Sequence, residues 1–217
     1  LGSFLRAQFA SPALVAAALL PILLTQLLIG AFGVLKVSMP AVRPFAWDDS
    51  FAAMDRALFF GHHPWETTHA LFGNATATRM IDSLYAVWIA LLFTTVLFFA
   101  LIAPRYLRAR FFLAFGASWL LIGVIGAYLF ASAGPCYTAL IGAQSAPDFE
   151  PLMRQLHQID GQGRLIAVSL QKLLWDAHVA HQHTLGMGIS AMPSMHNAIA
   201  LLYLLAVGSM GRGLRAI

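Results

Sequence analysis

Residues 12–35 read PALVAAALLPILLTQLLIGAFGVL, a run without a single charged side chain. This run exceeds the ~20 apolar residues that a helix needs to cross a bilayer. Two further uncharged runs cover residues 83–103 and 111–133, and a fourth, more polar at its start, covers 189–210. Three long runs of this kind are not expected in the core of a soluble domain of 217 residues, so they predict a polytopic membrane protein.

The composition also favours a membrane protein. Hydrophobic residues make up 59% of the chain and charged residues 10%, and the mean hydropathy is +0.75. The run at residues 12–35 is too long for the apolar region of a signal peptide and lacks a small-x-small cleavage site. We therefore expect an all-α integral membrane bundle with four spans in this chain and interfacial helices in its connections.

The basic residues predict the orientation of the spans. Three arginines and no acid lie in the connection 104–110, and three more flank the first and fourth runs. Alternating spans bring all six to one side, which the positive-inside rule makes cytoplasmic. They are Arg6, Arg105, Arg108, Arg110, Arg212 and Arg215. Because these residues do not cluster with aromatic side chains, the net charge of +4 gives no reason to expect a nucleic-acid partner.

The two long connections, 36–82 and 134–188, would then face the periplasm of a bacterial inner membrane or an equivalent side. In the first, Phe51 shares one helical face with Met54 and Leu58, which predicts a helix lying on the membrane. In the second, residues 164–178 have helical spacing and predict either a helix that covers the site or an ordinary loop helix. Residues 148–163 are polar and predict a mobile loop.

The chemically most informative residues are Pro193-Ser194-Met195-His196, where a polar loop meets the fourth apolar run. Pro193 suits the first position of a helix, whose free N–H groups and positive dipole end attract an anion. Ser194 can then donate to a phosphoryl oxygen, and His196 can protonate a leaving oxygen. A plain capped helix start with an interfacial histidine fits the same residues, and the pattern alone leaves both interpretations open.

The segment 190–198, SAMPSMHNA, resembles the second signature of the type 2 phosphatidic acid phosphatase superfamily, particularly its branch of aureobasidin-target inositol phosphotransferases. Three more segments resemble that branch in the same order: 44–48 (PFAWD), 82–88 (DSLYAVW) and 132–137 (SAGPCY). The resemblance implies phosphoryl transfer from a lipid phosphate or phospho-head group, among membrane lipids, to water or an alcohol. It also implies a phosphohistidine intermediate, no cofactor, and six spans in the full protein.

By this resemblance, Ser194 binds the phosphate and His196 protonates the leaving lipid alcohol. The superfamily's nucleophilic histidine and its aspartate partner belong to a third signature, which no segment up to Ile217 matches. We therefore expect residues 1–217 to form one domain that is truncated at the C-terminus and at the N-terminus. Such a fragment would be inactive alone.

Further residues complete the expected site. The charge of a phosphoryl group requires a cation, for which Lys172 and Arg164 are the preferred candidates. The resemblance implies that Tyr137 and Asp82 lie at the substrate mouth. The spacing of Lys36 and Arg43, followed by proline, matches the superfamily's first signature, but it lies two spans earlier than that signature normally does. Lys36 could equally extend its ammonium group to the membrane surface from the first span.

A metal site and a non-enzymatic role are the alternatives. His178, His181 and His183 are spaced closely enough to hold zinc, but no fourth ligand is evident, and surface histidines fit equally. No carboxylate pair is spaced for magnesium, so we expect no metal. A transporter or a scaffold remains the alternative function, although the three long runs lack the acidic or basic side chains that transporters place within spans.

Overall fold

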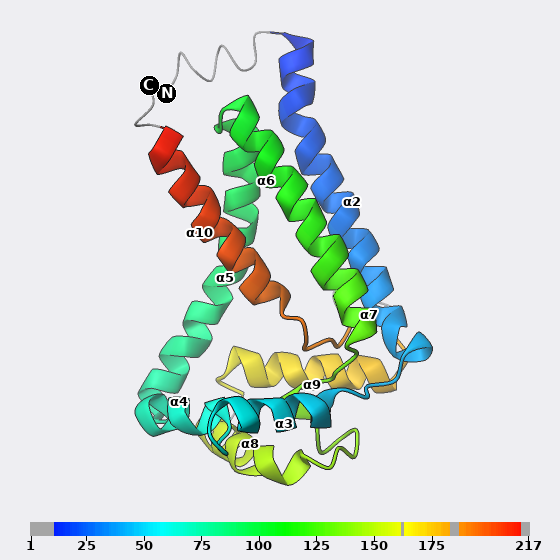
Figure 1. The fold of residues 1–217 in the computed structure, drawn as a ribbon, viewed down its shortest axis with the longest axis vertical. Coiled ribbons are helices and arrows are strands. Elements are labelled where there is room, and N and C mark those ends of the chain that lie inside the picture. Colours follow the sequence, from blue (N-terminus) through cyan, green and yellow to red (C-terminus); the bar gives the residue numbers. More distant parts are fainter. Residues whose placement is uncertain (1–10, 162, 183–186, 214–217) are drawn as a thin grey trace. The chain divides into compact units, whose positions relative to one another are not determined.

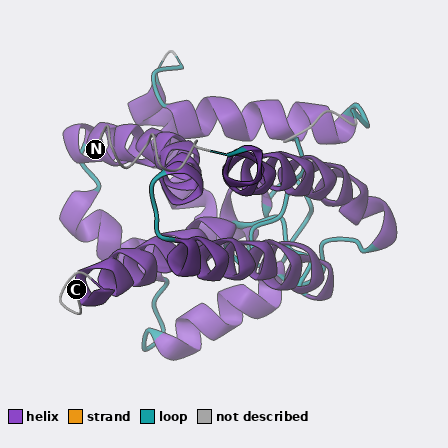
Figure 2. Ribbon diagram, turned by 90° about the horizontal axis from the view of Figure 1, so that it is seen from above, coloured by secondary structure: helices purple, strands orange, loops and turns teal. Residues whose placement is uncertain are grey.

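The computed structural model describes residues 11–161, 163–182 and 187–213, and these residues are helical with no strand among them (Figures 1 and 2). The helices are α2 (Pro12–Val42), α3 (Asp48–Leu58), α4 (Pro64–Phe72), α5 (Ala75–Leu101), α6 (Arg105–Ser118), the π-helix η1 (Trp119–Gly126), α7 (Ala127–Leu129), the 3₁₀ turn η2 (Pro135–Tyr137), α8 (Ala146–Asp160), α9 (Ile166–Val179) and α10 (Met195–Gly213). The all-α prediction is confirmed.

Within the part of the chain that the structure describes, three helices are long and apolar enough to cross a membrane: α2, α5 and the continuous helix Arg105–Leu129. Their most apolar parts have mean hydropathies between 2.0 and 2.3. Within the described residues, the apolar part of α10, Met195–Ser209, is shorter than these three helices, and residues 187–194 precede the helix. Three predicted spans are therefore long apolar helices, and the fourth is a shorter one.

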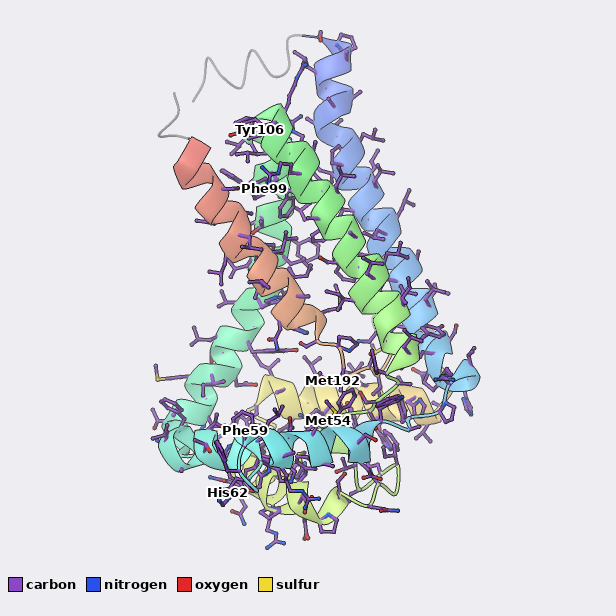
Figure 3. The ribbon with its side chains drawn as sticks, in the orientation of Figure 1. Met54, Phe59, His62, Phe99, Tyr106 and Met192 are labelled. Carbon is purple, nitrogen blue, oxygen red and sulfur yellow. The ribbon has the colours of Figure 1, made fainter. Side chains whose placement is uncertain are left out.

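The chain forms two compact units. The first comprises Leu1–Phe32, Trp88–Ile125 and Ser194–Ile217, and the second comprises Gly33–Val87 and Gly126–Pro193. In the first unit, side chains of α5, α6 and α10 form one core, which includes Phe99, Phe111 and Ile199. The rings of Phe99 (labelled in Figure 3) and Phe111 stack with centroids 4.0 Å apart, which fixes α5 against α6.

The connection between α5 and α6 is shorter than predicted. We expected a loop over residues 104–110, whereas α6 already begins at Arg105. Proline disfavours a helical residue before it and suits a helix start, so Pro104 ends one helix and begins the next. Arg108 is consequently helical and buried, and its guanidinium donates to the carbonyl oxygens of Ala17 (3.2 Å) and Ala103 (3.3 Å). Arg6 and Arg215 of the predicted cytoplasmic set lie outside the described residues.

The second unit contains α3, α4, α8 and α9. The helix predicted for residues 164–178 is present as α9, whereas the mobile loop predicted for residues 148–163 is wrong, because α8 covers most of it. Pro147 lies in the first turn of α8, and Phe149 buries its ring against His63, with centroids 4.9 Å apart. The apolar side chains of α8 also recur at helical spacing and are buried or half-buried, so the sequence already contained the pattern of an amphipathic helix: Phe149, Leu152, Met153, Leu156 and Ile159.

The apolar face predicted for the first connection is mostly exposed in α3, although Phe51 is half-buried beside Trp47 and Phe130. Met54 and Leu58 are both more than half exposed, and Phe59 follows at the end of the helix (Figure 3 labels Met54 and Phe59). The contact of this face with lipid stays a prediction.

Candidate active site

Ser194 caps the start of α10 in the first unit. The helix begins at Met195, and the Oγ of Ser194 accepts the backbone N–H of Asn197 at 3.4 Å. The Ser194 carbonyl oxygen accepts the N–H of Ala198 at 3.1 Å, as the first hydrogen bond of the helix. A serine whose side chain accepts the N–H three residues on is a typical N-cap. The expectation that Pro193 occupies the first helical position is wrong, because Ser194 takes the cap and Pro193 precedes it.

His196 lies on the first turn of α10 and is partly buried. Its ring packs against the indole of Trp88 on α5, with centroids 4.1 Å apart and planes at 39°. Both residues belong to the first unit, so this contact sets the direction of the imidazole relative to Ser194. From the sequence, Trp88 is notable only as part of the resembling segment 82–88. Its place in that segment was the only signal available.

The loop before α10 is anchored within the second unit. The backbone N–H of Ala191 donates to the carbonyl oxygen of Ser132 at 3.0 Å, and the N–H of Met192 donates to the Ser132 hydroxyl oxygen at 3.1 Å. Ser132 is 1% exposed and lies in the resembling segment 132–137. Two segments recognised separately in the sequence are thus hydrogen-bonded to each other.

Tyr137 is buried against α9. Its hydroxyl donates to the carbonyl oxygen of Gln171 at 3.0 Å, and its ring stacks on Trp175 with centroids 5.5 Å apart. Burial raises the pKa of Tyr137 well above its ordinary value, so the phenol remains protonated at neutral pH. Tyr137 and Trp175 form an aromatic wall of a cavity of about 540 Å³, which has room for a polar head group.

The predicted cations Lys172 and Arg164 are both exposed in the second unit. The ammonium group of Lys172 lies at the rim of the same cavity, 2.7 Å from the carboxylate of Asp176. An exposed ion pair of this kind contributes only about 0–1 kcal/mol, so an incoming anion can compete for Lys172. Arg164 precedes α9 and is not among the residues that line the cavity.

Asp82 is buried and caps α9, although it lies more than eighty residues before that helix in the sequence. Its two carboxylate oxygens accept the backbone N–H groups of Ile166 and Ala167, both at 2.8 Å. These N–H groups open α9 and have no acceptor within the helix, so Asp82 completes the hydrogen bonding of the helix start. This gives Asp82 a structural role, and its place at a substrate mouth stays a prediction.

Lys36 and Arg43 of the alternative phosphate signature lie at the end of α2. Lys36 is still helical, and Arg43 follows the last helical residue and is exposed. Gly188 packs so closely on Lys36 that a Cβ at Gly188 would lie 2.6 Å from the Lys36 Cγ. The lysine therefore adjoins the loop that leads to Pro193, within the second unit.

The histidine cluster is only partly within the described residues. His178 packs between the rings of Phe45 and Trp175, with centroid distances of 5.7 and 5.3 Å. Burial lowers the pKa of His178, and the neighbouring His181 lowers it further, so the ring favours its neutral form. His183 lies outside the described residues. Among the described residues, no group of three or more His, Cys, Asp or Glu side chains could hold a metal ion.

An all-α membrane bundle with a serine-capped helix and a histidine on its first turn is an arrangement suited to phosphoryl-transfer enzymes of the phosphatase type. The sequence model of the PAP2 superfamily matches residues 49–217, and the chain belongs to this superfamily. Comparisons with curated proteins and with solved structures gave no match. The matched residues contain the Ser194–His196 segment, whereas Lys36 and Arg43 precede them.

Proposed function

We propose that the protein transfers phosphoryl groups from lipid phosphates or phospho-head groups, through a phosphohistidine, to water or to an alcohol. The observation that carries this proposal is the start of α10, where Ser194 caps the helix and His196 lies on its first turn, within the residues that match the PAP2 superfamily. The resemblance to inositol phosphotransferases favours an alcohol acceptor. The family membership favours an enzyme over the transporter or scaffold alternative.

Ser194 has the hydrogen-bonding capacity that this role requires. A hydroxyl has one donor hydrogen and two acceptor lone pairs. The bond from Asn197 N–H uses one lone pair, so the O–H remains able to donate to a phosphoryl oxygen. The dipole of α10 adds a partial positive charge at the same end. Lys172 and Arg164 are the proposed cations for the remaining charge.

His196 would act as the general acid. The bond between phosphorus and the lipid oxygen breaks, and the imidazolium proton moves to that oxygen as the lipid alcohol leaves. The phosphoryl group passes to the nucleophilic histidine that the resemblance assigns to a third signature. In the second half-reaction, neutral His196 takes the proton of the attacking water or alcohol, which restores the starting state.

The test is phosphoryl transfer by the full-length protein in detergent, with short-chain phosphatidic acid as donor. We expect His196→Ala to lose about 10²–10⁴-fold in rate and Ser194→Ala to be impaired as well. The matched controls are His62→Ala, which changes an exposed side chain, and Ser118→Ala, which changes a half-buried one; both lie outside the site and should retain activity. Activity should also survive excess EDTA. If chelation abolishes activity and zinc restores it, the histidine cluster is the active centre and the proposal is wrong.

A further inference from the structure

Asp48 has a buried carboxylate, and each of its two oxygens accepts one backbone N–H group. It is the first residue of α3 and is 7% exposed. Its Oδ2 accepts the backbone N–H of Ala133 at 3.0 Å, and its Oδ1 accepts the N–H of Gly134 at 2.7 Å. A buried charge requires such donors in place of water. Because both carboxylate oxygens hold the backbone of residues 133–134, Asp48 fixes the position of that segment.

The segment held by Asp48 in turn holds residues 191–192, which belong to the resembling segment 190–198. Ser132 precedes Ala133 and accepts the N–H groups of both Ala191 and Met192, as described above. Gly134 has a φ of +99°, and a Cβ at this position would lie 2.8 Å from the Cβ of Ala191. Residues 132–134 and 191–192 are therefore in close contact within the second unit, with no room for a side chain between them.

We infer that Asp48 is a positioning residue for the proposed phosphoryl-transfer site, and this inference rests on the proposed function. Its carboxylate fixes residues 132–134, and Ser132 fixes Ala191 and Met192. Only Pro193 separates Met192 from Ser194 in the sequence, so the anchored backbone lies directly before the residue that caps α10. A displacement of a reacting group by about 1 Å can cost about 10²-fold in rate. Asp48 acts through this backbone and does not itself contact the reacting atoms.

Asp49 provides a matched control at the next position. Its carboxylate also accepts backbone N–H groups, from Gln144 at 3.1 Å and from Ser145 at 2.8 Å, and it accepts the Ser145 hydroxyl at 2.7 Å. These donors lie just ahead of α8 rather than in the segment that meets Ala191. The two aspartates thus make the same kind of contact to different loops of one unit.

The experiment compares Asp48→Asn with Asp49→Asn in the full-length protein. Asparagine keeps the shape but replaces one acceptor oxygen with an NH₂ group, so one backbone N–H loses its partner. We measure kcat and KM with short-chain phosphatidic acid, and hydrogen–deuterium exchange of the amides of Ala191 and Met192. For Asp48→Asn we expect kcat to fall by about tenfold or more with KM little changed, and faster exchange at both amides. For Asp49→Asn we expect neither change.

Equal kinetics and equal exchange in the two variants would overturn the inference, as would a loss of kcat in Asp48→Asn without faster exchange at Ala191 and Met192. If Asp48→Asn does not fold, Ser132→Ala tests the next contact along the chain, because this change removes only the acceptor of the Met192 N–H. It should lower kcat and speed exchange at Met192, while Ala191 keeps its bond to the Ser132 carbonyl oxygen and should exchange at an unchanged rate. If the unmodified protein transfers no phosphoryl group, the proposed function fails. The exchange measurement still decides whether Asp48 anchors residues 191–192.

Discussion

Ser194 and His196 lie within one turn of each other, and two different contacts fix them. Ser194 is held by the N–H of Asn197 on its own helix, whereas His196 is held by the Trp88 ring of a different helix. The cap is local and follows from the sequence. The direction of the imidazole depends on how α5 packs on α10. A substitution elsewhere that moved Trp88 would therefore change the orientation of the His196 ring.

Trp88 gives a prediction at the level of a single side chain. In the full-length enzyme, Trp88→Ala should lower kcat by about tenfold or more, because the imidazole of His196 loses the ring that orients it. Trp88→Phe keeps an aromatic ring at the contact and should lose much less. Steady-state kinetics of both variants measure this difference. Equal losses in the two variants would show that the ring contact does not orient His196.

The site residues differ in how far the sequence predicts them. The serine cap at Ser194 is visible in the sequence because an N-cap and its partner lie three residues apart. The bonds of Asp48 to Ala133 and of Asp82 to Ile166 join residues more than eighty positions apart, and no local pattern encodes them. The sequence therefore indicates that the segments containing Asp48 and Asp82 matter, but it does not predict which backbone groups their carboxylates hold.

At the level of elements, carboxylates from distant segments organise the second unit. Asp82 caps α9, Asp49 holds the start of α8, and Asp48 holds residues 133–134. The long apolar helices were predictable because composition alone defines them, whereas the polar average composition of α8 hid the helical spacing of its apolar residues. Helix α2 also continues beyond residue 35, past the predicted end, because its last turns pack within the second unit, where Met39 is fully buried against Ala127 and Ala131.

Asp82 provides the test at this scale. Asp82→Ala removes the acceptor of two N–H groups at the start of α9, and loss of a helix cap costs about 0.5–2 kcal/mol. We expect a lower midpoint of thermal unfolding in detergent and faster amide exchange at Ile166 and Ala167. Asp176→Ala breaks only an exposed ion pair on the same helix and should change stability by less than about 1 kcal/mol. Unchanged exchange at Ile166 in Asp82→Ala would refute the capping role.

At the level of the whole molecule, the proposed orientation requires Arg105 on the cytoplasmic side and α8 on the periplasmic side of a bacterial inner membrane. Arg108 is buried and unsuitable for labelling, but Arg105 and Gln158 are exposed. In a Cys136→Ser background, an impermeant thiol reagent should label Gln158→Cys in sealed cells and label Arg105→Cys only after lysis. Labelling of Arg105→Cys in sealed cells would show that the orientation is the reverse of the proposed one.

The central claim is that His196 donates a proton to the leaving oxygen, and the most direct test varies the leaving group. With an alkyl phosphate such as phosphatidic acid, the leaving alkoxide needs that proton, so His196→Ala should cost the full-length enzyme about 10²–10⁴-fold in rate. With 4-nitrophenyl phosphate, the nitrophenolate leaves unprotonated. On this substrate the loss of rate caused by His196→Ala should be at least about tenfold smaller than on phosphatidic acid. An equal loss on both substrates would contradict the account, because it would show that His196 does not act as the general acid.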